Sequence, residues 1–347
     1  MSIFRRLFGK TSDEFPAAPV AIPDAGPPEG SLPAKPEPTP SLPSEAAQEI
    51  DELDPTTRPL GTELPPAPHG ASPAVSAFVT QPLPPDAAIS RRATPVSFGL
   101  VSDVGLVRTN NQDAAVSLFS RNCSVDEYPD FGLFVVADGM GGHIEGEKAS
   151  AIVARVLATH VAKHIYLPLF APDNEGYRVP FTELLSEAIQ KANGEVIKHV
   201  PKGGTTATAV VIIGDLIHIA HVGDSRAYLI TEDGVEQLTR DHSLVQRLIE
   251  LDQLTPEEAV SHPQKNVLYR ALGQTESLEV DVMTRRMPAN SRLLICSDGL
   301  WGLIEEHDIF DISMNTANPQ QACEKLVALA NTHGGIDNIT AILLNIE

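Results

Sequence analysis

The sequence has few cysteines and no long hydrophobic run. Its three cysteines, Cys123, Cys296 and Cys323, stand far apart and form no Cys-x-x-Cys pair. This spacing argues against a disulfide framework and a structural zinc site, and it predicts a reducing, cytoplasmic setting. No run approaches the roughly 18 uncharged apolar residues of a membrane span, because Asp215 interrupts the longest one, residues 207–222. We therefore expect no transmembrane span.

Basic residues are also scarce. The chain has 25 Lys and Arg against 46 Asp and Glu, a formal net charge of −21. Residues 96–347 hold most of this excess, with 18 basic and 34 acidic side chains. Affinity for DNA or RNA comes largely from attraction between cations and phosphates. The charge balance therefore argues against a nucleic-acid partner.

Proline divides the chain into two parts. Residues 1–95 contain 20 of the 29 prolines, and residues 11–94 have only two aromatic residues and no apolar period. Such a segment buries too little surface to offset the loss of backbone entropy on folding. We predict a disordered, proline-rich tail over residues 1–94 and a folded domain over residues 95–347.

The tail has two features that leave alternatives open. Residues 1–10 (MSIFRRLFGK) place apolar side chains beside basic ones, in a run too short for a secretory signal. This amphipathic stub would contact a membrane surface or a partner groove, or it would simply fray. The proline-rich pieces over residues 36–40 and 65–68 would recruit a proline-binding module, or they would serve as a spacer.

The folded part combines short apolar runs with a few amphipathic helices. Several strands follow one another without a helix between them, which indicates an α+β fold of mainly antiparallel sheets with helices packed outside. Helical periods predict helices over residues 147–164, 181–200 and 320–333. Strands are predicted over residues 98–101, 115–119, 132–136, 207–213, 217–221, 227–230, 280–285, 293–296 and 339–345.

A segment between Arg240 and Gly273 interrupts the series of strands. It begins with a helix predicted over residues 243–254, and a capping box with proline at the first helical position follows at residues 255–258. Insertions of this kind are usually surface loops or lids.

Four apolar runs each meet an aspartate among small or turn-forming residues. The four aspartates are Asp138, Asp224, Asp298 and Asp337. Each alone is explained by a turn or a cap. Together they would place four carboxylates at the ends of neighbouring buried strands, where they repel one another unless a cation lies between them. Ligands that are all oxygen favour Mg²⁺ or Mn²⁺ over zinc.

Hard metal ions held by carboxylates suit the transfer of a phosphoryl group to water, because they acidify water and neutralise the phosphoryl charge. An acidic site accepts an anionic substrate only with such ions and a cationic side chain. Arg108, within SDVGLVRTNNQD (residues 102–113), is a candidate for a bidentate phosphate fork or a surface arginine at a strand end.

The ordered motifs resemble the series found in metal-dependent protein serine/threonine phosphatases of the 2C type, in their bacterial form. The resemblance covers residues 96–346 and implies a four-layer α/β/β/α sandwich with a metal cleft at one end of its sheets. After SDVGLVRTNNQD, the motifs are VVADGMGGHIEGEKAS (135–150), GGTTATAVVI (203–212), AHVGDSRAYLI (220–230), LTRDHSL (238–244), NVLYRALG (266–273), LLICSDGLWG (293–302) and DNITAILL (337–344).

The resemblance also implies roles for individual residues. Asp138 would bridge two catalytic Mn²⁺ or Mg²⁺ ions, with the backbone carbonyl of Gly139 as a further ligand. Asp298 and Asp337 would complete the binuclear site, and Asp224 with Asp298 would hold a third, weaker ion. Further implied features are a phosphate grip by Arg108, a water-orienting role for Asp113 and a mobile flap over residues 241–273.

Two positions depart from relatives in the family. Position 112 is Gln where some members have a metal-ligating Glu, and position 140 is Met where eukaryotic members have His. The proton donor for the leaving group is therefore open. His143 would donate this proton, or it would only stabilise the glycine turn and leave the task to water.

The sequence thus predicts a monomeric phosphatase that acts on phosphoserine and phosphothreonine proteins by direct attack of water. By the resemblance, its partners would include a Ser/Thr kinase and the proteins that this kinase phosphorylates. One alternative is a catalytically weak module of the same fold that binds phosphoproteins. Another is a scaffold whose tail is the main functional element.

Overall fold

The computed structural model describes residues 96–121, 128–141, 145–170 and 179–346. The predicted tail over residues 1–94 and the proposed proton donor His143 lie outside the described residues. In the part of the chain that is described, no helix has the length and apolar character needed to cross a membrane.

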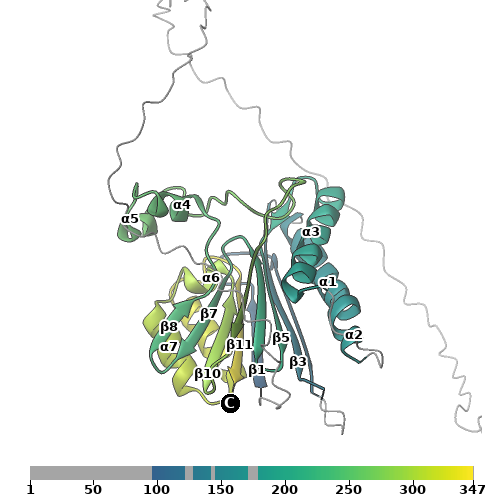
Figure 1. Cartoon of the computed structure of the whole chain (residues 1–347). Helices are drawn as coiled ribbons and strands as arrows, with labels where there is room; N and C mark the ends of the chain where they lie inside the picture. Colours follow the sequence, from purple (N-terminus) through teal and green to yellow (C-terminus); the bar gives the residue numbers. More distant parts are fainter. Residues whose placement is uncertain (1–95, 122–127, 142–144, 171–178, 347) are drawn as a thin grey trace, which may run out of the picture. The chain divides into compact units, whose positions relative to one another are not determined.

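Two antiparallel sheets form the centre of the fold (Figure 1). The first has the strand order β1-β11-β10-β7-β8, and the second has the order β2-β3-β5-β6-β9, with β4 paired to β3. The first sheet consists of β1 (Val96–Asp103), β11 (Ile339–Ile346), β10 (Ser291–Cys296), β7 (Arg226–Thr231) and β8 (Gly234–Gln237). The second consists of β2 (Asp113–Ser120), β3 (Phe131–Met140), β4 (Gly204–Thr205), β5 (Ala207–Ile213), β6 (Leu216–Val222) and β9 (Asp281–Arg286).

Helices cover the outer face of each sheet. The second sheet carries α1 (Glu145–Val161), which continues through a π-helical turn (Ala162–Tyr166) into α2 (Leu167–Leu169), and α3 (Phe181–His199). The first sheet carries α6 (Asp298–Trp301), α7 (Glu306–Asn315) and α8 (Pro319–Thr332). At the start of α8, Pro319 occupies the first turn, and the Asn318 side chain accepts hydrogen bonds from the backbone N–H groups of Gln320 and Gln321.

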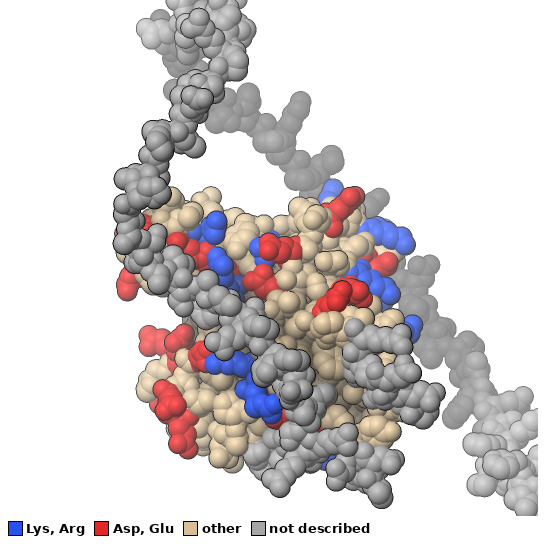
Figure 2. Space-filling view, viewed as in Figure 1, with Lys and Arg blue, Asp and Glu red and all other residues tan. Residues whose placement is uncertain are grey.

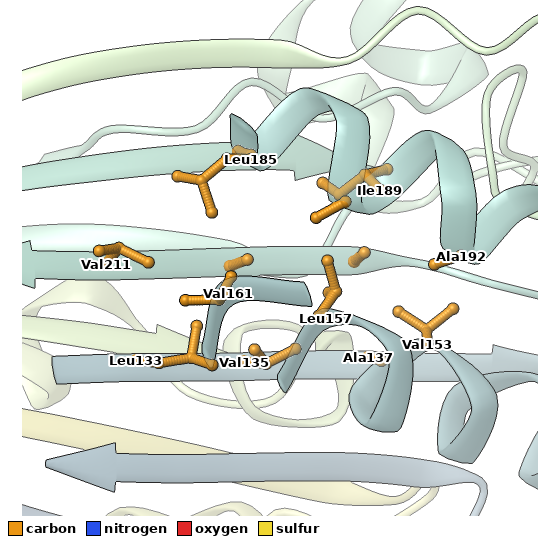
Figure 3. Close-up of a cluster of buried hydrophobic side chains, with 14 of the residues drawn as sticks. Leu133, Val135, Ala137, Val153, Leu157, Val161, Leu185, Ile189, Ala192 and Val211 are labelled. Carbon is orange, nitrogen blue, oxygen red and sulfur yellow. The ribbon is translucent and has the colours of Figure 1, made fainter. Parts of the chain in front are cut away.

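Three hydrophobic cores separate these layers. One lies between the second sheet and its helices, a second between the two sheets, and a third between the first sheet and α6, α7 and α8. Figure 3 shows part of the first core, with side chains of β3 (Leu133, Val135, Ala137) facing those of α1 (Val153, Leu157, Val161). Three cores between four layers confirm the predicted α/β/β/α sandwich.

Two short helices stand apart from the layers. Helix α4 (Leu244–Glu250) buries none of its residues, and α5 (Pro256–Val260) buries only Ala259. Figure 1 shows both beyond the ends of the strands. The predicted capping box is present, because the Thr255 hydroxyl and the Glu258 carboxylate each accept the other residue's backbone N–H.

All nine predicted strands are confirmed, with ends shifted by a few residues at most. The sequence did not predict β4 and β8 or helices α2, α6 and α7. The helix predicted over residues 243–254 was too long, because α4 ends at Glu250 and Asp252 adopts a left-handed backbone conformation with φ of 52°.

Charged side chains of both signs mix on the surface. On the face seen in Figure 2, Lys and Arg lie among Asp and Glu. Partly exposed ion pairs such as Arg285–Glu236, with 2.6 Å between Nη1 and Oε1, contribute to this mixing. Each such pair adds little to stability because water screens it.

Candidate active site

Five aspartates come together at one end of the two sheets. Asp138 lies near the end of β3, and Asp113 at the start of β2 is its direct partner in the strand register. Asp224 follows β6 in the same sheet. In the other sheet, Asp298 follows the end of β10 and Asp337 precedes β11.

Burial and mutual repulsion raise the pKa values of the central carboxyl groups. Desolvation is the largest cause at Asp138 and raises its pKa well above the ordinary value, and the nearby charges of Asp298, Asp113 and Asp224 add to it. The pKa values of Asp224 and Asp298 are raised as well, again mainly by burial. After burial, the charge of Asp298 has the largest effect on the pKa of Asp138. Such a group of acids favours a bound cation or a bound proton.

The Asp113 carboxyl group is held on one oxygen only. Its Oδ2 accepts hydrogen bonds from the hydroxyls of Thr340 at 2.6 Å and Ser297 at 2.8 Å. Its Oδ1 is buried without a hydrogen-bond partner among the described residues. Burial raises the pKa of Asp113 to about 7, against the lowering effect of the two hydroxyls. The free oxygen is therefore available to a further donor or cation.

The donor set fits a hard divalent cation. It consists of carboxylate oxygens that are buried and repel one another, and one oxygen of Asp113 lacks a partner. As the described side chains stand, no three His, Cys, Asp or Glu residues are arranged so that they could hold a metal ion. Arg108 contacts one of the five carboxylates, that of Asp337, and a bound cation would compete with this contact.

The backbone of Asp138 is fixed by the two threonines that begin the next part of the sheet. The Asp138 N–H donates to the Thr206 hydroxyl at 2.9 Å, and its carbonyl accepts from the Thr205 hydroxyl at 2.7 Å and the Thr206 N–H at 2.8 Å. A side chain at Gly139 would meet the Gly146 carbonyl oxygen at 2.2 Å. Only glycine allows α1 to start this close to β3.

The backbone around Asp224 is held from two sides. Gly223 donates its N–H to Nδ1 of His242 at 3.0 Å, and its carbonyl accepts the His242 N–H at 2.7 Å. On the other side, the Trp301 indole N–H donates to the Asp224 carbonyl at 3.0 Å. The guanidinium of Arg226 lies 3.6 Å from the centre of the Trp301 ring and binds both carboxylate oxygens of Asp241.

Arg108 lies at the exposed edge of the site. Its Nη2 atom is 2.6 Å from Oδ2 of Asp337, and this contact raises the pKa of the guanidinium. The loop that carries it is organised by Asn338. The amide of Asn338 donates to the carbonyls of Val104 and Asn110, both at 2.9 Å. Its oxygen accepts the backbone N–H of Gln112 at 2.8 Å.

A depression of about 500 Å³ lies beside the end of β3. Met140 forms part of its wall, and Gln274 contacts the Met140 sulfur from the opposite side at 3.8 Å. Its remaining lining is mostly glycine and lysine or proline backbone, from Gly141, Pro201, Lys202, Gly203, Gly204 and Gly273. Two of its lining residues, Met140 and Gly141, directly follow Gly139 in the chain.

Comparison with known proteins identifies the family. Residues 100–248 match the model of the family described as protein phosphatase 2C. The serine/threonine phosphatase stp of Listeria innocua is 34% identical over 249 residues, which cover 70% of this chain and 93% of that protein. The chain belongs to the protein phosphatase 2C family.

Solved structures agree with this membership. The serine/threonine phosphatase of S. agalactiae is 32% identical with a TM-score of 0.63, and the match covers 73% of this chain and 100% of that one. The catalytic domain of the phosphatase PstP in complex with two manganese ions is 29% identical, with a TM-score of 0.58 and coverage of 72% and 98%. Membership makes this chain a protein-serine/threonine phosphatase.

In this protein phosphatase 2C, most of the predicted site residues lie together. Asp113, Asp138, Asp298 and Asp337 form the group described above, with Asp224 beside Asp298 and Arg108 on Asp337. Gln112 occupies the position where some members of the family have Glu. Its side-chain amide donates to the Gly141 carbonyl at 3.4 Å.

Sequence analysis did not predict the residues that hydrogen-bond to the backbone around Asp138, Asp224 and Arg108. Thr205, Thr206, His242, Trp301 and Asn338 all lie inside the motifs that suggested the family, but no role was assigned to them. The sequence signal was their place within these motifs. Their partners described above lie from 19 to 234 residues away in the chain, so spacing alone does not reveal the contacts.

Proposed function

We propose that this chain removes phosphate from phosphoserine and phosphothreonine by direct attack of water, with two Mn²⁺ or Mg²⁺ ions as cofactors. The observation that carries the proposal is the burial of Asp138, Asp298 and Asp113 together, with Arg108 at the edge of the group. When bound, the ions would acidify water and neutralise charge on the transferring phosphoryl group. The relative PstP has been solved with two manganese ions, which supports the choice of metal.

Asp138 would bridge the two ions, with help from the backbone carbonyl of Gly139, and Asp298 and Asp337 would complete the set. The threonines that fix the Asp138 backbone would limit the reorganisation needed on binding. Asp224 would hold a third, weaker ion together with Asp298. Arg108, now on Asp337, would turn to the phosphate, whose oxygens accept a guanidinium fork.

Asp113 would orient the attacking water and hold its proton. Its Oδ2 is fixed by Thr340 and Ser297, so the unpartnered Oδ1 is the oxygen available to water. That oxygen would accept a hydrogen bond from the water and then its proton. The proton of the leaving group would come from His143 or from water.

The flap is proposed over residues 241–273, which contain α4 and α5. At its ends, Nε2 of His242 is 3.2 Å from Oδ2 of Asp281, and Arg270 contacts Asp281 at 2.8 Å. These contacts would anchor the flap to β9 beside the cleft. Substrates are proposed to be proteins phosphorylated by a Ser/Thr kinase. The cytoplasmic setting, the monomeric state and the tail's contact with a partner or a membrane surface stay predictions.

The first test is hydrolysis of a phosphothreonine peptide by the full chain with Mn²⁺, with Mg²⁺ and with EDTA. We expect phosphate release that needs the metal and falls by more than about a hundredfold in Asp298→Asn. Asp233→Asn is the matched control, because Asp233 is an exposed aspartate in the turn between β7 and β8. A folded chain that binds Mn²⁺ but releases no phosphate would instead favour a phosphoprotein-binding module.

A further inference from the structure

Three large aliphatic side chains stand exposed beside Arg108 and Asp337. Leu106 is 68% exposed, Val107 is 64% exposed and Ile336 is 57% exposed. Val107 directly precedes Arg108, and Ile336 directly precedes Asp337. We refer to Leu106, Val107 and Ile336 as the aliphatic rim.

The rim is held together by its backbone. The N–H groups of Leu106 and Val107 both donate to the Gly335 carbonyl, at 2.7 and 3.3 Å. A side chain at Gly105 would meet the Asp337 carbonyl oxygen at 2.2 Å, and the φ of Gly105 is 78°. Only glycine therefore allows the two loops to come this close. The rim is therefore a fixed surface continuous with the phosphate end of the site.

Single exposed apolar residues are common on protein surfaces, whereas neighbouring ones next to a functional site mark a contact surface. The rim is of the second kind, because its two loops carry the proposed phosphate ligand and a proposed metal ligand. Neither loop needs these side chains for its own hydrogen bonds, which are made by the backbone and by Asn338.

We infer that the aliphatic rim binds an aliphatic side chain adjacent to the phosphorylated residue of the substrate protein. In an extended peptide, neighbouring residues are about 3.3 Å apart along the chain, so a phosphate on Arg108 brings the flanking residues to the rim. The acidic charge of residues 96–347 also opposes flanking Asp or Glu. This inference rests on the proposed function and adds a preference in sequence to it.

The test compares three phosphothreonine peptides on the full chain with Mn²⁺, with para-nitrophenyl phosphate as a substrate that lacks flanking residues. The peptides differ only in the residues on both sides of phosphothreonine, which are Ile, Ser or Asp. We expect kcat/KM to be about tenfold higher for the Ile peptide than for the Ser peptide, as partial burial of an aliphatic side chain predicts. The Asp peptide should be the poorest.

The variant Leu106→Ser/Val107→Ser/Ile336→Ser should remove this preference, so that the Ile peptide falls to the level of the Ser peptide. Serine keeps the backbone N–H donors, and hydrolysis of para-nitrophenyl phosphate should stay within about twofold of wild type. Leu167→Ser is the matched control. Leu167 lies on α2 and is 60% exposed. It is 22 helical residues from the start of α1 at Glu145, which lies beside Gly139. At 1.5 Å per residue this is about 33 Å.

Equal kcat/KM values for the Ile and Ser peptides in the wild type would overturn the inference while leaving the proposed function intact. The inference would also be overturned if the triple variant lost as much kcat/KM on para-nitrophenyl phosphate as on the Ile peptide. The rim would then support the loop of Arg108 and would not bind the flanking residue. If the wild type hydrolyses none of the substrates with Mn²⁺, the proposed function fails, and the inference fails with it.

Discussion

The indole N–H of Trp301 donates to the backbone carbonyl of Asp224, across 77 residues of sequence, at a distance of 3.0 Å. The same ring carries the guanidinium of Arg226 at 3.6 Å from its centre. The backbone of Asp224 is therefore held by a residue of α6, the short helix that begins with Asp298. Trp301 thus links two of the proposed metal ligands, because it shares a helix with Asp298 and binds the backbone of Asp224.

Replacing Trp301 with Phe should separate the hydrogen bond from the ring contact. Phe keeps the aromatic face for Arg226 but removes the donor to Asp224, so we expect a loss of about 1 kcal/mol in the free energy of unfolding. Looser placement of Asp224 should also raise the Mn²⁺ concentration needed for half-maximal activity. Urea unfolding and a Mn²⁺ titration measure the two effects. Unchanged values in both would show that the hydrogen bond does not position Asp224.

Replacing Asn338 with Ala should disorganise the loop that carries Arg108. The substitution leaves the carbonyls of Val104 and Asn110 and the N–H of Gln112 without their partner. We expect the free energy of unfolding to fall by about 3 kcal/mol. Well below its melting temperature the variant stays folded, and kcat/KM should still fall there, because the loop that carries Arg108 is no longer held in place.

Asn338→Asp is the informative companion to this variant. It keeps an acceptor for the Gln112 N–H, but it places a buried carboxylate oxygen against the two carbonyls in place of the amide donors, so its stability should not exceed that of Asn338→Ala. If both variants hydrolyse a phosphothreonine peptide as fast as wild type, Asn338 does not position Arg108.

Much of the fold could be predicted because its strands are short apolar runs between turn residues. β5 and β6 are buried along their whole length, and their pattern is unambiguous. β8 was not predicted because Gly234–Gln237 is a short, half-buried edge strand with little apolar content. Helix α6 was not predicted because four residues are too few to show a helical period.

The site was predicted in part for a similar reason. The aspartates stand at the ends of apolar runs, and this placement is visible in the sequence. Pairing between distant strands is not, since β1 pairs with β11 across more than two hundred residues. The contacts of Thr206 and Asn338 depend on this pairing, and Thr and Asn have many local uses in turns.

The raised pKa of Asp113 gives a dependence of stability on pH. The pKa of Asp113 is about 7 in the folded state and near 3.8 in the unfolded chain, so the protonated acid favours the folded state. This contribution to the free energy of unfolding is fully present below about pH 4 and is lost as the pH rises toward 7. In EDTA, wild type should lose stability relative to Asp113→Asn between pH 5 and pH 7.5, by on the order of 1 kcal/mol or more.

The comparison with Asp113→Asn removes the opposing effect of buried histidines. Burial lowers the pKa of His221 to about 3 and that of His218 to about 4, so the stability that each contributes grows as the pH rises from these values toward 6.5 and is fully present above it. Because the wild type and the variant share these histidines, their difference reports on Asp113. Urea unfolding at a series of pH values measures it, and a difference that does not change with pH would contradict the shifted pKa.

Two glycines should respond to alanine in opposite directions. At Gly139 the new methyl group would lie 2.2 Å from the Gly146 carbonyl oxygen, which belongs to backbone and cannot turn away, so β3 and α1 would have to separate. We expect Gly139→Ala to lower the free energy of unfolding by about 3 kcal/mol or to prevent folding. Gly194 lies inside α3 with nothing within 4 Å of the added carbon.

Gly194→Ala should therefore raise stability by up to about 1 kcal/mol, because alanine favours the helix and restricts the unfolded chain. Thermal unfolding of both variants beside wild type measures the contrast, and hydrolysis of para-nitrophenyl phosphate should stay unchanged in Gly194→Ala. A Gly139→Ala protein as stable as wild type would mean that β3 and α1 are not in the close contact described here. The ligand role proposed for the Gly139 carbonyl would then lose its structural basis, because that contact sets where the carbonyl lies.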